Sequence, residues 1–194
     1  MTSGRGAREA LLERCLTYLQ QNGFSQRSLR EIAAGTGTSH RMILYHFGSR
    51  DGLLAAVVGR IEAEQRAALA DLTDATDNPI EVGRLFWQRL ADPALAPAER
   101  LFFEIYAQAL FGQPWTQSFR ASVIEAWTRP IEEQFVRQGF TPAEARRRTR
   151  LALAAIRGLL LDLLITGDRQ ILDEAAELFA HLLTSPDPAS APLR

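Results

Sequence analysis

The feature that most constrains this chain is a series of helix start and stop signals spaced along its length. Ser28 and Glu31 have the spacing of a capping box, in which each side chain bonds a backbone N–H of the first helical turn. Asn78–Glu81 and Thr141–Glu144 repeat the pattern and place proline at the first helical position, where a missing N–H is tolerated. A weaker version, without a capping side chain, begins at Ala96. Glycines suited to helix ends stand at Gly23, Gly37, Gly112, Gly139 and Gly167.

Between these signals the apolar residues follow helical periodicity. No stretch of useful length alternates apolar and polar residues, and Asp51-Gly52 lies within a helical pattern rather than between two β-branched runs. The sequence therefore predicts an all-α fold of about nine helices. The expected helices cover residues 7–22, 28–35, 39–45, 49–72, 79–91, 97–111, 115–138, 142–166 and 168–184. Pro130 is expected to kink or split the seventh helix, and the proline-rich residues 185–194 to form a disordered tail.

Charge is distributed unevenly along the chain. The formal net charge of the 194 residues is −1, which by itself carries no nucleic-acid signature. Residues 1–60, however, hold eight Arg against four acidic residues, and the remainder holds 14 Arg against 19 acidic residues. This asymmetry fits a basic, phosphate-facing head on an acidic body, and a chance run of solvated arginines is the alternative.

Residues 24–54 carry the pattern that is most informative about function. They predict two short helices joined by a tight turn at Gly37, the geometry of a helix-turn-helix, whose second helix can enter the major groove of DNA. Ile32 and Ala33 are expected to face the core. The second helix opens with short polar side chains and an arginine at 38–41, where recognition helices contact base edges. The alternative is two short helices with incidental polar residues.

This stretch resembles the TetR/AcrR family of one-component transcriptional regulators. The matching residues are Leu29, Ile32, Ala33, Gly37, Ser39 and the run YHFGSRDGLL at 45–54. The resemblance implies a helix-turn-helix DNA-binding domain of three helices at 1–48, followed at 49–184 by a helical ligand-binding and dimerisation domain. A long helix beginning at Ser49 would link the two, and Phe47 would pack inside the head.

The resemblance also implies which residues contact DNA. Ser28 and Arg50 would contact phosphates, and Tyr45 and His46 would lie against the backbone. The residues expected to face bases or backbone are Thr38, Ser39, His40 and Arg41. The sequence departs from the family pattern at two positions. Leu44 replaces an aromatic residue, and Arg50 replaces a lysine, which keeps the charge and adds bidentate reach towards a phosphate.

Nine of the 16 aromatic residues lie between residues 80 and 130, which indicates a ligand pocket in the helical body. Ligand pockets are mostly apolar, with a few polar groups that orient the ligand. The expected ligand-binding residues are Trp87, Phe103, Tyr106, Gln108, Trp115 and Trp127, with Glu104 as a further polar candidate. Core packing is the alternative for each of them. By resemblance, the effector would be a small apolar or amphipathic molecule.

The helix expected at 142–166 is apolar on more than one face, which is more than a single core contact requires. Its apolar positions are Leu151, Ala152, Ala155, Ile156, Leu159, Leu160 and Leu163. The helix expected at 168–184 has a similar apolar stripe. Together they predict a homodimer in which these two helices pair with the same helices of a second copy. An internal helix in a monomer is the alternative.

Motifs for catalysis, metal binding or cofactor binding are absent from the sequence. The three histidines, His40, His46 and His181, lack metal-ligand spacing, and there is no phosphate-binding loop or nucleophile elbow. No enzyme activity, metal or cofactor is therefore expected. Cys15 has no second cysteine to pair with and is expected to be an inert core thiol.

The sequence predicts no membrane segment. The most apolar run, residues 151–165, contains Arg157 and Asp162 and is shorter than the about 20 apolar residues that span a bilayer. The first ten residues have no apolar signal region. The chain is therefore expected to be cytoplasmic.

These patterns together predict a ligand-responsive, sequence-specific DNA-binding regulator. The expected form is a homodimeric repressor that binds a near-palindromic double-stranded operator and is released by a small-molecule effector. The alternative is a helical small-molecule carrier or bundle enzyme with a vestigial helix-turn-helix. DNA affinity that falls steeply with salt would separate the two, because counterions are released only where phosphates are contacted.

Overall fold

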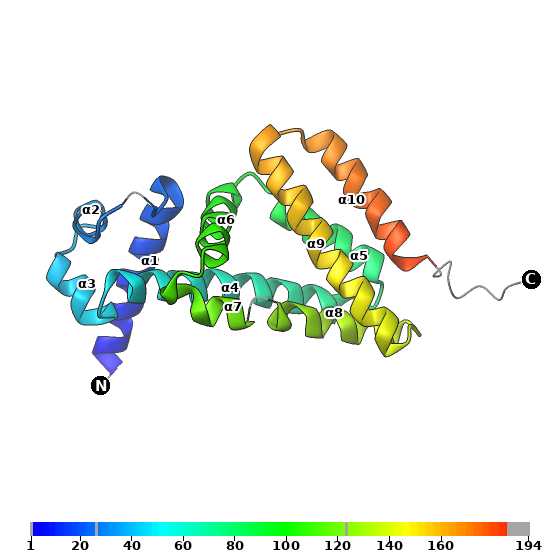
Figure 1. Cartoon of the computed structure of the whole chain (residues 1–194), viewed down its shortest axis with the longest axis horizontal. Coiled ribbons are helices and arrows are strands. Elements are labelled where there is room, and N and C mark those ends of the chain that lie inside the picture. The colour runs from blue at the N-terminus through cyan, green and yellow to red at the C-terminus, as the bar shows by residue number, and fades with distance from the viewer. Residues whose placement is uncertain (1, 26, 123, 186–194) are drawn as a thin grey trace, which may run out of the picture. The chain divides into compact units, whose positions relative to one another are not determined.

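In the computed structural model, which describes residues 2–25, 27–122 and 124–185, every regular element is helical (Figure 1). The elements of these residues are α1 (Thr2–Asn22), α2 (Leu29–Gly35), α3 (His40–Phe47), α4 (Arg50–Ala75), α5 (Pro79–Leu90), α6 (Ala96–Leu110), the 3-10 turn η1 (Pro114–Thr116), α7 (Gln117–Ser122), α8 (Glu125–Arg137), α9 (Pro142–Thr166) and α10 (Arg169–Thr184). The all-α prediction is confirmed. The predicted tail lies outside the described residues, apart from Ser185.

The three predicted capping side chains begin α2, α5 and α9. The capping boxes at Ser28 and Thr141 form with both reciprocal hydrogen bonds. At Asn78 only half of the box forms: the Asn78 side chain caps the helix, but the Glu81 carboxylate accepts from the Thr76 hydroxyl instead. All five glycines expected at helix ends have positive φ. Local chemistry therefore accounts for these helix starts and for the helix ends at the five glycines.

The predicted helix 115–138 is divided, but not at its proline. The structure has η1 and α7 in its first part and begins α8 at Glu125, whereas Pro130 lies inside α8. A proline inside a helix removes one backbone hydrogen bond. Burial of Trp127 and Phe135 on the same helix offsets that loss, since each removes a large apolar area from water.

The chain forms two compact units, and α4 contributes to both. Unit 1 comprises residues 1–65 and 94–124, and its core joins side chains of α1, α2, α3, α6, α7 and the first half of α4. Packing therefore groups α6 and α7 with the predicted head, while the division by role after residue 48 stays a prediction.

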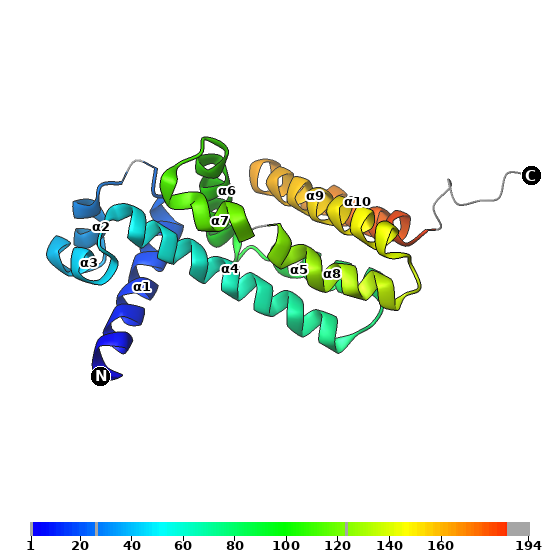
Figure 2. The same cartoon turned by 60° about the horizontal axis from the view of Figure 1, so that its bottom comes forward.

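Unit 2 comprises residues 66–93 and 125–194 and contains α5, α8, α9 and α10. Here α9 packs against α8 and α10, and α10 also packs against α5. The α9 and α10 helices run antiparallel, side by side, joined by a turn at Gly167 (Figures 1 and 2). Among the residues that the structure describes, no helix combines the length and the apolar character needed to cross a membrane.

Candidate nucleic-acid interface and ligand cavity

Helices α2 and α3 form the predicted helix-turn-helix in unit 1. Ile32 and Ala33 of α2, and Ile43 and Phe47 of α3, are buried in the core of the unit. The turn between the helices requires Gly37, whose φ of +64° lies in the left-handed region that side chains disfavour. The inner faces of both helices are therefore fixed by the core, which leaves the opposite face of α3 available.

The outer face of α3 carries three of the predicted DNA-contacting side chains. His40 and Arg41 are exposed at its N-terminal end, and Tyr45, one turn further along, is 78% exposed. Met42 and Leu44, which sequence reasoning left out of the interface, are also exposed. Exposed apolar side chains on a recognition helix can contact thymine methyl groups. This surface combines a cation, polar rings and apolar groups, the chemistry that reads base edges.

Ser28 and Ser39 are the N-cap residues of α2 and α3, a structural role that the sequence predicted only for Ser28. The Ser28 hydroxyl accepts from Glu31 N at 3.2 Å, and the Ser39 hydroxyl accepts from Met42 N at 3.2 Å. Both side chains are exposed, so each hydroxyl can still donate to a phosphate. Thr38 and His46 are partly buried. The predicted residues that are exposed thus lie on α3 and at the N-caps of α2 and α3, and their contact with DNA stays a prediction.

The capping box at Ser28 also sets a pH dependence for α2. The pKa of Glu31 is lowered, first because the Ser28 backbone N–H donates to its carboxylate and second because of the Ser28 side chain. A carboxyl whose pKa is lowered in the folded state stabilises the fold at neutral pH. That contribution is lost as the pH falls through the lowered value.

Arg50 is partly buried and bonds the head internally. Its Nε donates to Arg27 O at 3.1 Å, and its Nη2 donates to Phe24 O at 2.7 Å. Arginine has five N–H donors, so it can hold two carbonyls and still face a phosphate. The first turn of α4 is thereby fixed to the connection between α1 and α2, and the predicted phosphate contact of Arg50 stays a prediction.

Glu104 of α6 also bonds the connection between α1 and α2, and it does so with a negatively charged side chain where Arg50 uses a positively charged one. Its carboxylate accepts from Phe24 N at 3.0 Å and from Ser25 N at 2.7 Å. The Phe24 ring is buried and packs edge-on against Trp115, with ring centroids 5.5 Å apart. Sequence reasoning named Glu104 as a candidate for the few polar groups that orient a ligand in an apolar pocket. In the structure its carboxylate is instead bonded to the backbone of residues 24–25.

Replacing Glu104 with alanine is expected to destabilise the chain by about 1–3 kcal/mol, because the buried N–H of Phe24 loses its acceptor. Urea denaturation would measure the change in the free energy of unfolding. Asp71→Ala, which removes an exposed acid from α4, is the control and should change it by less than about 0.5 kcal/mol. Equal effects of the two substitutions would show that the carboxylate bonds to residues 24–25 add nothing specific.

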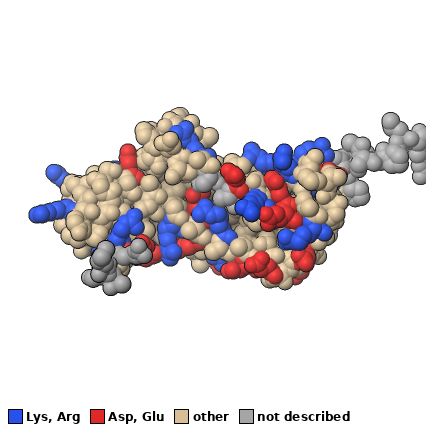
Figure 3. Space-filling view, turned by 90° about the horizontal axis from the view of Figure 1, so that it is seen from below, with Lys and Arg blue, Asp and Glu red and all other residues tan. Residues whose placement is uncertain are grey.

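The charged side chains of the surface follow the asymmetry seen in the sequence. In Figure 3, basic side chains project from the part of unit 1 that carries α2 and α3, whereas acidic and basic side chains are mixed over unit 2. A basic patch around a helix-turn-helix attracts the phosphate backbone, and this attraction is independent of base sequence. The charge distribution thus fits the α3 surface described above.

The structure separates the six residues predicted to bind a ligand. Phe103, Tyr106, Gln108 and Trp115 belong to unit 1 and are partly buried there. The rings of Phe103 and Tyr106 pack against Phe102, at centroid distances of 5.8 and 5.1 Å. These contacts give the aromatic rings a packing role, the alternative that the sequence left open. None of the four lines the cavity found in unit 2.

Trp87 is buried in unit 2, and its polar atom already has a partner. The indole Nε1 donates to Asp173 at 2.6 Å, and Arg169 bonds the same carboxylate at 2.7 Å. Arg169 also donates to the carbonyl of Ala91. Trp87 therefore joins α5 to the start of α10, beside a polar depression that also includes Arg84 and Glu177.

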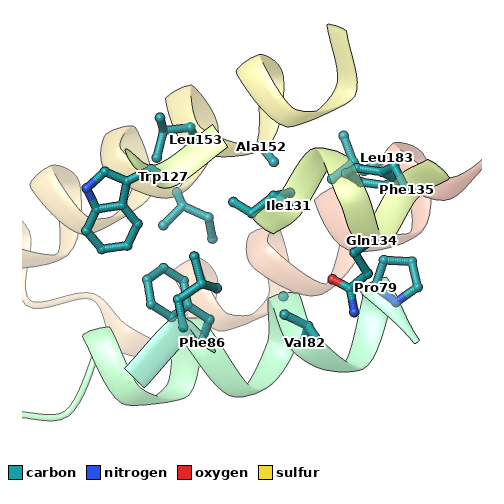
Figure 4. Close-up of a pocket in the computed structure, with 13 residues that line it drawn as sticks. Pro79, Val82, Phe86, Trp127, Ile131, Gln134, Phe135, Ala152, Leu153 and Leu183 are labelled. Carbon is teal, nitrogen blue, oxygen red and sulfur yellow. The ribbon is translucent and has the colours of Figure 1, made fainter. Parts of the chain in front are cut away.

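Trp127, the sixth residue, lines an apolar cavity of about 70 Å³ in unit 2 (Figure 4). The residues around this cavity come from α4, α5, α8, α9 and α10. They are Leu69, Pro79, Val82, Gly83, Phe86, Trp127, Ile131, Gln134, Phe135, Ala152, Leu153, Ile156 and Leu183. None of these residues is charged, and Gln134 is the one that carries an amide. Sequence reasoning missed most of them because an apolar stripe gives no sign of where the packing leaves a gap.

Cys15 is free and fully buried in the core of unit 1. Burial raises the pKa of its thiol, the largest influence on it, so the reactive thiolate is disfavoured. Among the described residues, no group of three or more His, Cys, Asp or Glu side chains is placed to hold a metal ion.

Helical architecture and an outward-facing α3 place this chain among the helix-turn-helix proteins. Residues 11–57 match the model of the bacterial regulatory proteins, tetR family. This segment runs from α1 into α4 and includes the whole helix-turn-helix. No curated protein matches the sequence.

Solved structures share the fold along most of the chain. A transcriptional regulator from Rhodococcus sp. Rha1 has a TM-score of 0.79 and 19% identity, over 91% of this chain and 95% of its own. A TetR transcriptional regulator from Legionella pneumophila has a TM-score of 0.74 and 18% identity, over 89% and 94%. Thermus thermophilus FadR, a TetR-family repressor in complex with lauroyl-CoA, has a TM-score of 0.64 and 20% identity, over 96% and 100%.

The predicted resemblance is therefore confirmed. Residues 11–57 match the family's N-terminal segment, and the fold is shared with solved transcriptional regulators, among them one of the TetR family.

Proposed function

We propose that this protein is a ligand-responsive repressor that binds double-stranded operator DNA through α3 and acts as a homodimer in the cytoplasm. The observation that carries the proposal is the exposed face of α3, where His40, Arg41 and Tyr45 project from a helix whose opposite face is buried. A recognition helix needs that combination, because its inner face must be rigid while its outer face contacts the bases.

The exposed apolar side chains of α9 and α10 support the dimer. Leu151, Gly158, Leu161 and Ile165 recur along one face of α9 and are all exposed. On α10, Ile171, Leu178 and Leu182 do the same. Apolar stripes on two adjacent antiparallel helices fit a four-helix interface with the same pair of a second copy. Two heads would then face half-sites about 34 Å apart, or a multiple of it, on a near-palindromic operator.

The course of α4 supports a ligand response. Its first half contributes Leu53 and Val57 to the core that holds the helix-turn-helix, and its second half contributes Leu69 to the cavity of unit 2. A ligand that fits the cavity better when the heads are away from operator spacing would shift the population to that state. DNA release would follow in proportion to this difference in affinity.

Selection of bound sites from fragmented source DNA tests the proposal. We expect recovery of a sequence with two inverted half-sites, and an affinity that falls steeply with salt, because several phosphate contacts release counterions. A purified chain that ignores duplex DNA at low ionic strength would contradict the proposal. Such a result would favour the carrier or bundle enzyme that the sequence left as the alternative.

Arg41→Ala is expected to weaken binding to the recovered site by about 10- to 100-fold, because an arginine at a base edge contributes about 1–3 kcal/mol of discrimination. Arg30→Ala is the matched control, since it removes an exposed arginine from α2 of the same head. Fluorescence anisotropy with labelled duplexes would compare the two, and the control should lose less than about threefold. If both variants lose affinity equally on every duplex, Arg41 acts as a charge and does not read bases.

A further inference from the structure

Gln134 of α8 is the group that gives the apolar cavity of unit 2 its chemical preference. The residue is 2% exposed and lines the cavity. Its side-chain Nε2 donates to the backbone carbonyl of Thr76 at 3.0 Å. This bond fixes the orientation of the amide, because the opposite orientation would place two carbonyl oxygens against each other.

The fixed amide leaves Gln134 Oε1 as an acceptor on the cavity wall. In Figure 4 this oxygen, drawn in red, is turned towards the middle of the labelled side chains, while the nitrogen, drawn in blue, lies below it and nearer Val82. Oε1 has no hydrogen-bond partner among the residues that the structure describes. An amide oxygen surrounded by apolar side chains is costly to leave unpaired, so a donor from a bound molecule would be stabilising.

The rest of the wall excludes charged ligands. None of the cavity-lining residues carries a charge, so an anion would lose its hydration without gaining a counter-charge. A carboxylate would also place its oxygens against Oε1. The other polar atom of the lining, Trp127 Nε1, is drawn on the far side of its ring from the other labelled side chains.

From this geometry we propose that the cavity binds a neutral apolar molecule with one hydroxyl or N–H group, which donates to Gln134 Oε1. The cavity volume of about 70 Å³ is far below the about 300–1,000 Å³ of sites for drug-sized ligands. It therefore suits a short alcohol, or the hydroxyl-bearing end of a longer molecule. The inference rests on the proposed function in one respect, namely that the molecule bound there acts as the effector.

Gln134 also lies at a place from which binding could reach the head. Thr76, its partner, directly follows α4, which ends at Ala75 and begins in unit 1. Gln138, which directly follows α8, donates in the same way to the carbonyl of Asp77 at 2.7 Å. Two amides, one in α8 and one just after it, thus bond the chain just after α4, and the first of them is also on the cavity wall.

Titration calorimetry with two isomeric ligands tests the donor directly on the unmodified protein. 1-Pentanol and butyl methyl ether contain the same atoms, but the alcohol alone has a donor. Because water solvates the alcohol better, a cavity without a usable acceptor would prefer the ether. We expect the alcohol to bind about five- to tenfold more tightly, the size of one neutral hydrogen bond, and pentanoate to bind more weakly than either. Equal or stronger binding of the ether, or stronger binding of pentanoate, would overturn the proposal.

Two matched substitutions assign the preference to one side chain. Gln134→Leu removes the acceptor and should abolish the preference for 1-pentanol over the ether. Gln138→Leu removes the equivalent bond, which is made to the carbonyl of Asp77. Because Gln138 is exposed and does not line the cavity, this variant should keep the wild-type preference for the alcohol. A Gln134→Leu variant that still prefers the alcohol would exclude Gln134 as its partner. If this variant does not fold, the comparison of 1-pentanol with butyl methyl ether on the wild-type protein still decides whether the cavity prefers a hydrogen-bond donor.

DNA binding by the ligand-free protein separates this inference from the proposed function. A chain that binds its selected operator but shows no preference for the alcohol overturns the donor proposal alone. A chain that prefers the alcohol but binds no duplex overturns the proposed regulator and leaves the assignment of the cavity intact.

Discussion

Replacing Ile165 and Leu178 together with glutamate is expected to give a monomer whose operator affinity falls by about 100-fold or more. Both residues are largely exposed in the single chain, at 75% and 62%, so the substitutions place charges in water and leave the monomer fold intact. In the proposed interface the same charges would be buried without partners, which costs several kcal/mol. Loss of the second head also removes the avidity gained by joining two half-site contacts.

Light scattering would measure the molar mass of the double variant, and anisotropy its operator affinity. Leu110→Glu with Phe111→Glu is the matched control, because both residues are apolar and 82% exposed but lie at the end of α6 in unit 1. Leu159 and Leu163, apolar positions indicated by the sequence, are partly buried and would be poorer choices. If the Ile165/Leu178 variant keeps the mass of a dimer, the interface lies elsewhere on the chain.

Gly52→Ala is expected to lower the free energy of unfolding by about 1–3 kcal/mol and to reduce operator affinity further. A Cβ atom at Gly52 would lie 2.0 Å from the backbone oxygen of Phe47, the last residue of α3. A backbone carbonyl has no rotamer by which to move away, so α3 must shift against the first turn of α4. The recognition helix would then be displaced relative to the helix that joins it to the rest of the chain.

Thermal unfolding and operator binding would be measured side by side for this variant. Gly59→Ala is the control, because Gly59 lies in the same helix and a Cβ there meets no atom within 4 Å. Alanine is a better helix former than glycine, so this control should gain up to about 1 kcal/mol. Should Gly52→Ala be as stable as Gly59→Ala, the α3–α4 junction tolerates more movement than its geometry implies.

The helix-turn-helix and most helix bounds were predictable because their signals are local. A capping box such as Ser28 with Glu31 bonds residues three apart, and Gly37 acts on its own backbone. The outward face of α3 was expected from the helix-turn-helix geometry and the family resemblance, and in the structure Ile43 and Phe47 are buried while Arg41 and Tyr45 are exposed. A split at Pro130 was one of the two outcomes expected of that proline, and it does not occur, since the predicted helix 115–138 is divided before Glu125 and Pro130 lies inside α8.

The residues that line the cavity were the least predictable from the sequence. An aromatic residue that fills a core and one that lines a cavity have the same sequence pattern, since both lie on apolar helix faces. Phe103 and Tyr106 pack in unit 1, whereas the cavity is in unit 2 and includes Gln134, a residue that the sequence did not single out.

By itself, the sequence determined which segments are helical, which face of each is apolar and where the recognition helix begins, since each depends on residues within a few positions. Tertiary structure decided which distant groups meet. Glu104 bonds a turn 80 positions away, Trp87 bonds Asp173 86 positions away, and Gln134 bonds a carbonyl 58 positions away. Helical periodicity shows that an apolar helix face must be covered. Which helix covers it, and whether a cavity is left between the two, depends on how all the helices pack.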